Sequence, residues 1–129
     1  MLNFMEKTMN AIIYTYDDLE YESIRARINS LDIPVELARP PLVGHKSYYE
    51  RYDLVVVCLD GAEGMEVVME YNQRFKDSQL IWISEDQYFA GTAMRAHIHD
   101  FIVRPYNLDE IENSIKEAVG KLRTGKRRR

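Results

Sequence analysis

The sequence predicts an α/β fold in which one parallel β-sheet is covered by helices on both faces. Short segments rich in β-branched and aromatic residues alternate with segments in which apolar residues recur every three or four positions. Residues 54–59 are almost continuously apolar, which is typical of a central parallel strand buried on both faces. Parallel strands need helix-sized connections, and this alternation supplies them. At 129 residues the chain has the length of one domain.

The individual elements are predicted in order along the chain. Strands are expected at 10–16, 35–38, 54–59, 80–84 and 101–103. Helices are expected at about 21–31, 64–74 and 107–122, with shorter ones at 45–51 and 88–96. The last long helix has the clearest start, because Asn107 and Glu110 form an Asx-type variant of a capping box.

The connections favour a doubly wound sheet with the flavodoxin-like strand order 2-1-3-4-5. In this order ligands bind beyond the carboxyl ends of the first and third strands, where the direction of winding reverses. Asp17 and Asp18 follow the first predicted strand, and Cys58 and Asp60 lie at the end of the third. The sequence therefore predicts that these four residues share one edge of the sheet.

Composition excludes several classes of protein. Apolar residues make up 46% and charged residues 29% of the chain, which is typical of a globular domain. No apolar run approaches the roughly 20 residues of a membrane span. Glu6 and Lys7 interrupt the region where an export signal needs an apolar core. Cys58 is the single cysteine, so no internal disulfide can form. We therefore expect a cytoplasmic protein.

Charge is distributed unevenly along the chain. The net charge is −4, but segment 121–129 carries six Lys and Arg and no acidic residue, so residues 1–120 carry −10. We expect an N-terminal extension at 1–9, one domain at 10–120 and a disordered basic tail at 121–129. The acidic body repels nucleic acid and anionic lipid, whereas contact of the tail with either remains an alternative.

Polar residues at the predicted strand ends carry the functional signal. They are Asp17, Asp18, Cys58, Asp60, Ser84 and Arg104. Together they resemble the response-regulator receiver domain, the CheY-like family, over about residues 10–119. Segment 93–111, AMRAHIHDFIVRPYNLDEI, resembles the family pattern ALxxGAxDYLxKPFxxxEL and is the most specific part of the match.

The resemblance implies a role for each matching position. In the family an acidic pair after the first strand binds Mg²⁺, which corresponds to Asp17 and Asp18, with Tyr16 and Asp17 as an alternative register. A Ser or Thr ends the fourth strand, which corresponds to Ser84. A Lys-Pro pair follows the fifth, where this chain has Arg104, Pro105 and then Tyr106. Phe101 corresponds to the switch aromatic of the family.

The phosphoryl acceptor departs from the family. Aligning residues 53–58, DLVVVC, on the family's DLVLLD places Cys58 at the phosphorylated position, and Asp60 two residues further is the alternative acceptor. A thiolate is a poor ligand for Mg²⁺, which prefers hard oxygens. Glu85 adds bulk and negative charge after Ser84, and the planar guanidinium of Arg104 does not replace a lysine ammonium.

Each candidate residue also has a structural interpretation. Cys58 is either a thiol switch or a small buried residue whose reactivity nearby carboxylates suppress. Asp17 and Asp18 form either a residual metal site or a loop pair that favours a helix N-terminus. His45, His97 and His99 lack a third ligand fixed by the sequence, so we expect them to face solvent in loops.

The sequence therefore predicts a pseudo-receiver that is not an enzyme and acts through phosphorylation-independent protein–protein interaction in bacterial-type signalling or transcription control. We expect no resident cofactor, with Mg²⁺ at Asp17 and Asp18 as the alternative. The nine tyrosines suit an interface, and the family directs attention to a homodimer through the last two helices and strand five, around Phe101 and Tyr106. Two other functions stay open, which are autophosphorylation on Asp60 and a thiol switch at Cys58.

Overall fold

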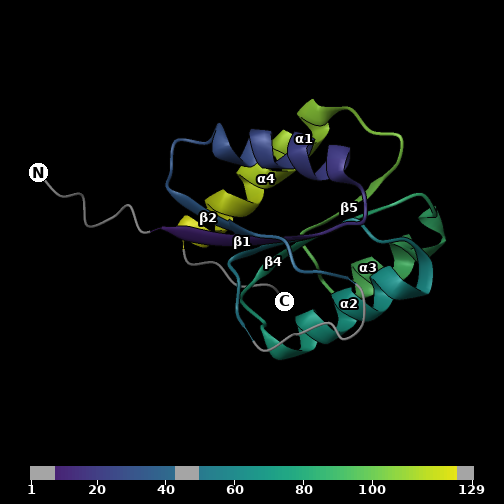
Figure 1. The fold of residues 1–129 in the computed structure, drawn as a ribbon. Coiled ribbons are helices and arrows are strands. Elements are labelled where there is room, and N and C mark those ends of the chain that lie inside the picture. The colour runs from purple at the N-terminus through teal and green to yellow at the C-terminus, as the bar shows by residue number, and fades with distance from the viewer. Residues whose placement is uncertain (1–7, 43–49, 125–129) are drawn as a thin grey trace, which may run out of the picture.

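The computed structural model describes residues 8–42 and 50–124. It contains a five-stranded, fully parallel sheet with the order β2-β1-β3-β4-β5, which confirms the predicted topology (Figure 1). The strands are β1 (Met9–Tyr14), β2 (Val35–Ala38), β3 (Leu54–Val57), β4 (Gln79–Ser84) and β5 (Asp100–Val103). The helices are α1 (Asp18–Asn29), α2 (Gly61–Arg74), α3 (Ala90–Arg95), preceded by the 3₁₀ turn Gln87–Phe89, and α4 (Leu108–Arg123).

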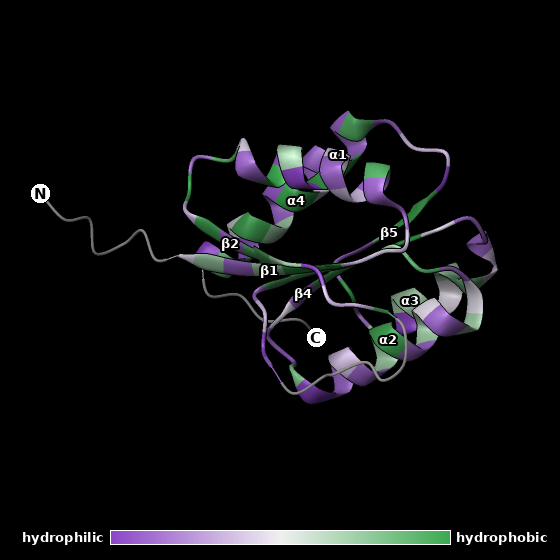
Figure 2. Ribbon diagram, viewed as in Figure 1, coloured by the Kyte–Doolittle hydropathy of each residue, from purple (hydrophilic) through white to green (hydrophobic). Residues whose placement is uncertain are grey.

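The helices cover both faces of the sheet. Helices α1 and α4 lie on one face, and α2 and α3 lie on the other (Figure 1). Every residue of β3 is buried, because the strand lies in the middle of the sheet between the two helical layers. Its residues alternate between two apolar cores, as Val56 belongs to the core beneath α1 and α4 and Val57 to the core beneath α2. The apolar colouring of Figure 2 follows the sheet and the inner sides of the helices.

Helix α4 shows how local sequence determines its position. The Oδ1 atom of Asn107 accepts the backbone N–H of Glu110 at 2.8 Å, which confirms the predicted cap. Ile111, Ile115 and Ala118 recur at helical spacing and are fully buried against the sheet. On the outer side, Arg27 of α1 lies within 4 Å of both Asp109 and Glu112, so charge pairs join the two helices of this layer.

Several predicted boundaries differ from those observed. Strand β1 ends at Tyr14, not at Tyr16, because the chain then turns towards α1. Helix α2 begins at Gly61, three residues earlier than expected, and Gly61 has a positive φ of 60° that suits glycine. The segment expected as one helix at 88–96 is a 3₁₀ turn followed by α3.

The ends of the domain also differ slightly from the expectation. Helix α4 continues to Arg123, one residue beyond its expected end at 122 and three residues into the segment expected as a tail, while 1–7 and 125–129 fall outside the described residues. Most of the helix expected at 45–51, with His45, also lies outside them. Among the described residues, no helix is both long and apolar enough to cross a membrane.

Candidate functional site

The site lies at the carboxyl edge of the sheet, where the ends of four strands meet. Tyr14 pairs with Val57, and the N–H of Cys58 donates to the carbonyl of Tyr14 at 2.8 Å, so the ladder continues past both strand ends. Thr15, the residue directly after β1, is therefore next to Cys58, and it is buried. The N–H of Arg104 donates to the carbonyl of Ser84 at 2.9 Å, which brings β4 and β5 to the same edge.

The guanidinium of Arg104 links the elements around this edge. Its Nε and Nη2 atoms donate to the two carboxylate oxygens of Glu20, at 3.1 and 2.9 Å. Its Nη1 donates to Oδ1 of Asp60 at 2.8 Å, and Nη2 also donates to the carbonyl of Cys58 at 3.0 Å. One cation thus joins α1, the end of β3 and the start of α2. A bidentate arginine–carboxylate pair is among the strongest polar contacts in proteins.

The inner half of this network is protected from water. The side chain of Glu20 is 8% exposed and that of Arg104 is 19% exposed, whereas that of Asp60 is 49% exposed. The hydroxyl of Tyr106 donates to Oε2 of Glu20 at 2.8 Å, and Thr15 Oγ1 donates to Oε1 at 3.3 Å. Glu20 therefore has hydrogen bonds from three side chains, which offset the cost of burying its charge.

The pKa values of the surrounding groups follow from this arrangement. Burial alone would lower the pKa of Arg104, but the hydrogen bonds and charge of Glu20 outweigh it and raise that pKa. Burial, and then the hydrogen bond to Glu20, raise the pKa of Tyr106, so its phenol stays protonated. Both groups keep the proton that their hydrogen bond to Glu20 requires.

Cys58 lies at the base of this network and belongs to the apolar core. Its side chain packs in the cluster beneath α1 and α4. Burial, and then the negative charge of Glu20, raise the pKa of the thiol well above its ordinary value, although Arg104 opposes this effect. The thiol is therefore neutral at physiological pH and a poor nucleophile.

Asp17 and Asp18 have different partners from those expected for a metal site. The Oδ1 atom of Asp17 accepts the N–H groups of Leu19 and Glu20, at 2.9 and 3.2 Å, and so caps α1. The carboxylate of Asp18 is 87% exposed and pairs with Arg39 at 2.8 Å. Thr15, and neither aspartate, occupies the position beside Cys58 at the end of β1.

Ser84, Asp60 and Glu85 also meet at this edge. Ser84 is fully buried, and its Oγ accepts the N–H of Asp86 at 3.1 Å. The N–H of Glu85 donates to Oδ1 of Asp60 at 2.8 Å, while the residue itself is exposed. The Oδ1 atom of Asp60 therefore accepts from two donors, which are the Glu85 backbone and the Arg104 guanidinium.

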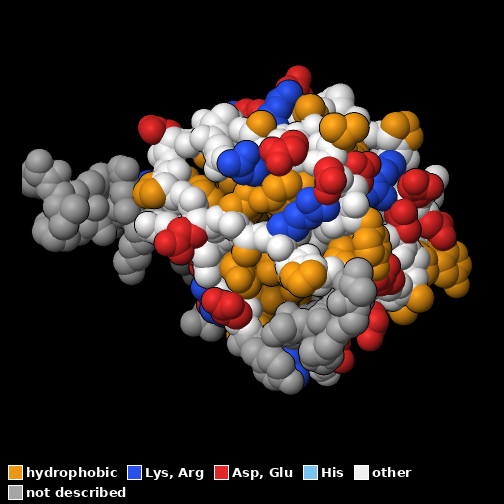
Figure 3. Space-filling view, in the orientation of Figure 1, with side chains coloured by type: hydrophobic (Ala, Val, Ile, Leu, Met, Phe, Trp, Pro, Cys, Tyr) orange, Lys and Arg blue, Asp and Glu red, His pale blue; other side chains and the backbone are white. Residues whose placement is uncertain are grey.

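The remaining predicted residues lie around the fifth strand. Phe101 is partly buried and packs edge-to-face on Trp82, with ring centroids 5.3 Å apart. Pro105 follows Arg104 through a cis peptide bond. Pro105 and Tyr106 line a surface hollow of about 620 Å³ together with Glu20 and Arg104. On the face shown in Figure 3, acidic and basic side chains are interspersed.

The sequence analysis missed Glu20 and placed His99 in the wrong environment. Glu20 lies in the first turn of α1, where an acidic residue usually faces solvent, and only the position of Arg104 in space reveals its role. His99 was expected in solvent, but this is wrong, because its side chain is 3% exposed. Its Nε2 atom lies 2.9 Å from the carbonyl of Ser114, and its Nδ1 atom lies 2.9 Å from Nζ of Lys121.

Comparisons with known proteins depend on structure alone. No protein-family model and no curated protein sequence matches the chain. The response regulatory domain of protein mrkE from Klebsiella pneumoniae is similar, with a TM-score of 0.72 and 15% identity over 90% of this chain and 99% of that one. A CheY-like receiver domain protein from Methanospirillum hungatei has a TM-score of 0.70 and 15% identity, covering 92% and 99% of the two chains.

A third structure agrees with these two. The receiver domain of AraT, a response regulator from Geobacillus stearothermophilus, has a TM-score of 0.71 and 18% identity over 91% of this chain and 97% of its own. All three are single receiver domains covered almost completely by the match. The chain therefore has the CheY-like fold of response-regulator receiver domains, as the resemblance in residues 10–119 implies.

Proposed function

We propose that the chain is a pseudo-receiver, a CheY-like signalling module that acts through phosphorylation-independent protein–protein interaction. The observation that carries this proposal is the pairing of Arg104 with both Glu20 and Asp60 at the carboxyl edge of the sheet. The cation that would neutralise an incoming phosphoryl group is already neutralised by two carboxylates of the same chain. The residue aligned with the acceptor, Cys58, is a buried neutral thiol.

Phosphoryl transfer needs a nucleophile and cations that are not already paired with other groups, and at this edge of the sheet they are paired. It requires an oxygen nucleophile in line with the leaving group and cations that stabilise the developing charge. Asp60 lies near the aligned position and its side chain is 49% exposed, but its Oδ1 accepts from Glu85 and Arg104. Releasing Arg104 from Asp60 for a phosphoryl group would still leave it paired with Glu20.

Magnesium chemistry is also disfavoured by the available ligands. Among residues 8–42 and 50–124, no group of three or more His, Cys, Asp or Glu side chains could hold a metal ion. Mg²⁺ prefers hard oxygen ligands in octahedral geometry, whereas Thr15 and Cys58 are neutral and Glu20 is paired with Arg104. These residues do not suit the ion, and we propose no step that uses it.

A direct experiment separates this proposal from its main alternative. The intact protein is incubated with acetyl phosphate and Mg²⁺ and then examined by mass spectrometry. We expect no added mass of a phosphoryl group. A hydroxylamine-sensitive adduct that disappears in Asp60→Asn and persists in Cys58→Ser would replace this proposal with autophosphorylation on Asp60.

The interaction surface of the pseudo-receiver stays a prediction. A homodimer through α3, β5 and α4 is supported by exposed apolar side chains on and beside α3, as Tyr88 is 82% and Met94 is 74% exposed. Sedimentation equilibrium of the wild type and of Met94→Glu tests it. A dimer weakened by the substitution is expected, and a monomer at all concentrations would rule it out.

A further inference from the structure

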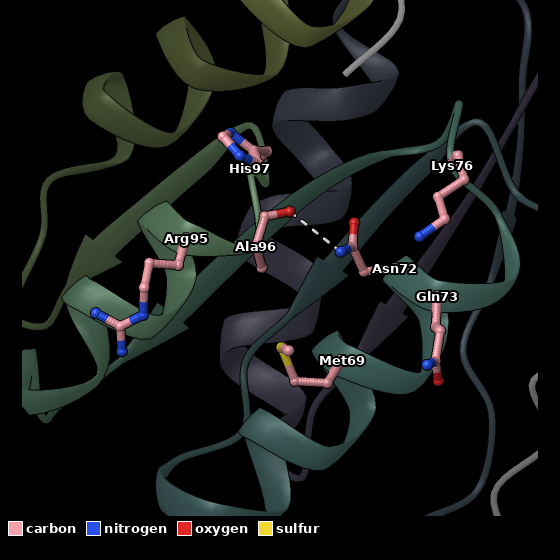
Figure 4. Close-up of a pocket in the computed structure, with 7 residues that line it drawn as sticks. All are labelled: Met69, Asn72, Gln73, Lys76, Arg95, Ala96 and His97. Atoms are coloured by element: carbon pink, nitrogen blue, oxygen red, sulfur yellow. Dashed lines mark hydrogen bonds between the residues drawn. The ribbon is translucent and has the colours of Figure 1, made fainter. Parts of the chain in front are cut away.

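A groove on the face opposite α4 has a composition unlike the rest of the surface. It has a volume of about 460 Å³ and lies between α2 and the end of α3 (Figure 4). Met69, Asn72, Gln73 and Lys76 line one side, and Arg95 and His97 line the other. The Nδ2 atom of Asn72 donates to the carbonyl of Ala96 at 3.1 Å, which connects the two walls. The groove is therefore formed by fixed elements and not by a chance arrangement of side chains.

The charge of the groove is opposite to that of the domain. Residues 1–120 carry −10, yet no acidic side chain lines the groove, and the wall formed by the end of α3 and the following turn has the basic residues Arg95 and His97. Most other described arginines lie within 4 Å of a carboxylate, namely Arg25, Arg27, Arg39, Arg51 and Arg104. Arg95 makes only a weak contact with Thr92 Oγ1 at 3.4 Å among the described residues. Its guanidinium is therefore available to an external anion.

His97 adds a second, independent feature. Its φ is 59°, and it is the one non-glycine residue with positive φ in the described chain. The family pattern aligned with segment 93–111 has glycine at this position, which is the residue that adopts this conformation without cost. The chain therefore tolerates an unfavourable backbone conformation to keep an imidazole beside the groove. Met69, 41% exposed, supplies apolar surface next to these polar groups.

We propose that the α2–α3 groove binds an acidic peptide segment of a partner protein, with separate acidic side chains against Arg95 and His97 and an apolar side chain against Met69. A short acidic segment can contact the acid-free groove alone, whereas an extended nucleic acid would also lie against the acidic remainder of the domain, which repels it. This surface would serve the proposed function, and the inference depends on that function only because it assumes that the partner is a protein. The acetyl phosphate experiment involves other residues, so the two can fail separately.

The test uses the ¹⁵N-labelled full chain and a capped hexapeptide, Glu-Glu-Leu-Glu-Glu-Leu, with Gln-Gln-Leu-Gln-Gln-Leu as its neutral counterpart. We expect the acidic peptide to shift amide signals of groove residues such as Gln73, Lys76 and His97. Arg95→Gln should weaken binding about tenfold, the loss typical of one charge-assisted hydrogen bond. Arg123→Gln, which removes another exposed charge at the end of α4, is the matched control and should not weaken binding.

His97→Gly is a second variant, and it should keep the fold because glycine adopts the observed positive φ without strain. It removes the imidazole, so it should also weaken binding of the acidic peptide. Equal losses in Arg95→Gln and Arg123→Gln, or shifts spread over basic residues outside the groove, would show nonspecific attraction and overturn the proposal. Equal binding of the neutral peptide would overturn it too. Inorganic phosphate that shifts the same signals while the peptide does not would identify a small-anion site instead.

Discussion

The Nη1 atom of Arg104 lies 2.8 Å from Oδ1 of Asp60, while the same guanidinium pairs with both carboxylate oxygens of Glu20. The three residues come from the end of β5, the start of α2 and the first turn of α1. A single side chain therefore connects elements that lie far apart in the sequence. The network therefore balances one guanidinium against two carboxylates of the same chain.

Removing the cation of this network should destabilise the fold. Arg104→Met leaves Glu20, which is 8% exposed, as an uncompensated buried charge, and we expect a loss of about 3 kcal/mol in the free energy of unfolding. Urea denaturation followed by circular dichroism measures it. Arg25→Met removes a pair on the exposed surface of α1 and should cost less than about 1 kcal/mol. Similar losses of unfolding free energy in both variants would show that burial of Glu20 does not determine the cost of removing its partner.

Cys58 should be unreactive in the native state. Burial raises the pKa of its thiol well above the ordinary value, so little thiolate exists near neutral pH. We expect iodoacetamide to leave the folded protein unmodified at pH 7.5 and to alkylate it fully in guanidinium chloride, as read by intact mass. Rapid alkylation of the folded protein would instead support the thiol-switch hypothesis.

Two helical glycines should respond in opposite directions to alanine. A Cβ atom on Gly64 would overlap the carbonyl oxygen of Leu59 and lie 2.7 Å from Nε1 of Trp82, so Gly64→Ala should destabilise the protein by about 2 kcal/mol. A Cβ on Gly120 would meet nothing within 4 Å, and Gly120→Ala should stabilise α4 by about 0.5–1 kcal/mol. Thermal unfolding compares both with the wild type. A neutral Gly64→Ala would show that α2 moves easily away from Leu59.

His99 should make stability depend on pH. Burial, and then the positive charge of Lys121, lower its pKa in the folded protein below the ordinary 6.5, while Asp100, Glu117 and the Ser114 carbonyl oppose this shift. The unfolded chain therefore binds the proton more readily. The stabilising contribution is complete above about pH 6.5 and is lost as the pH falls below that value towards the folded pKa.

The measurement compares the free energy of unfolding of the wild type and His99→Gln at pH 7.5, 6.5 and 5.5. The substitution removes the titrating group, while its amide can still donate to the carbonyl of Ser114. We expect the wild type to lose more stability than the variant between pH 6.5 and 5.5. Parallel pH profiles would show that other groups determine the acid sensitivity.

The periodicity of the sequence was sufficient to predict a parallel sheet and its major helices, and the flavodoxin-like strand order expected for that sheet is the one observed. Continuous apolar residues in β3 and the cap at Asn107 are local signals, so the chain itself reveals them. The predicted end of β1 and the predicted start of α2 were less accurate. The turn after Tyr14 determines the first boundary, and the positive φ of Gly61 determines the second.

The candidate site was predicted less completely because it depends on distances across the fold. Arg104, Cys58 and Asp60 do come together, as the strand order required. The importance of Glu20 comes from its contact with Arg104, 84 positions away, which no local pattern reveals. The sequence placed His99 in a loop, and only its contacts with Ser114 and Lys121 of α4 reveal that its side chain is buried.

Trp82 provides the protein with a built-in optical reporter. It is the single tryptophan, it is fully buried, and its Nε1 donates to the carbonyl of Leu59 at 2.9 Å, immediately between Cys58 and Asp60. Its ring also contacts Phe89 and Phe101. Any partner that displaces the loop after β3 or the aromatic side chain on β5 should therefore change the wavelength or intensity of tryptophan emission, without a label and from one known position.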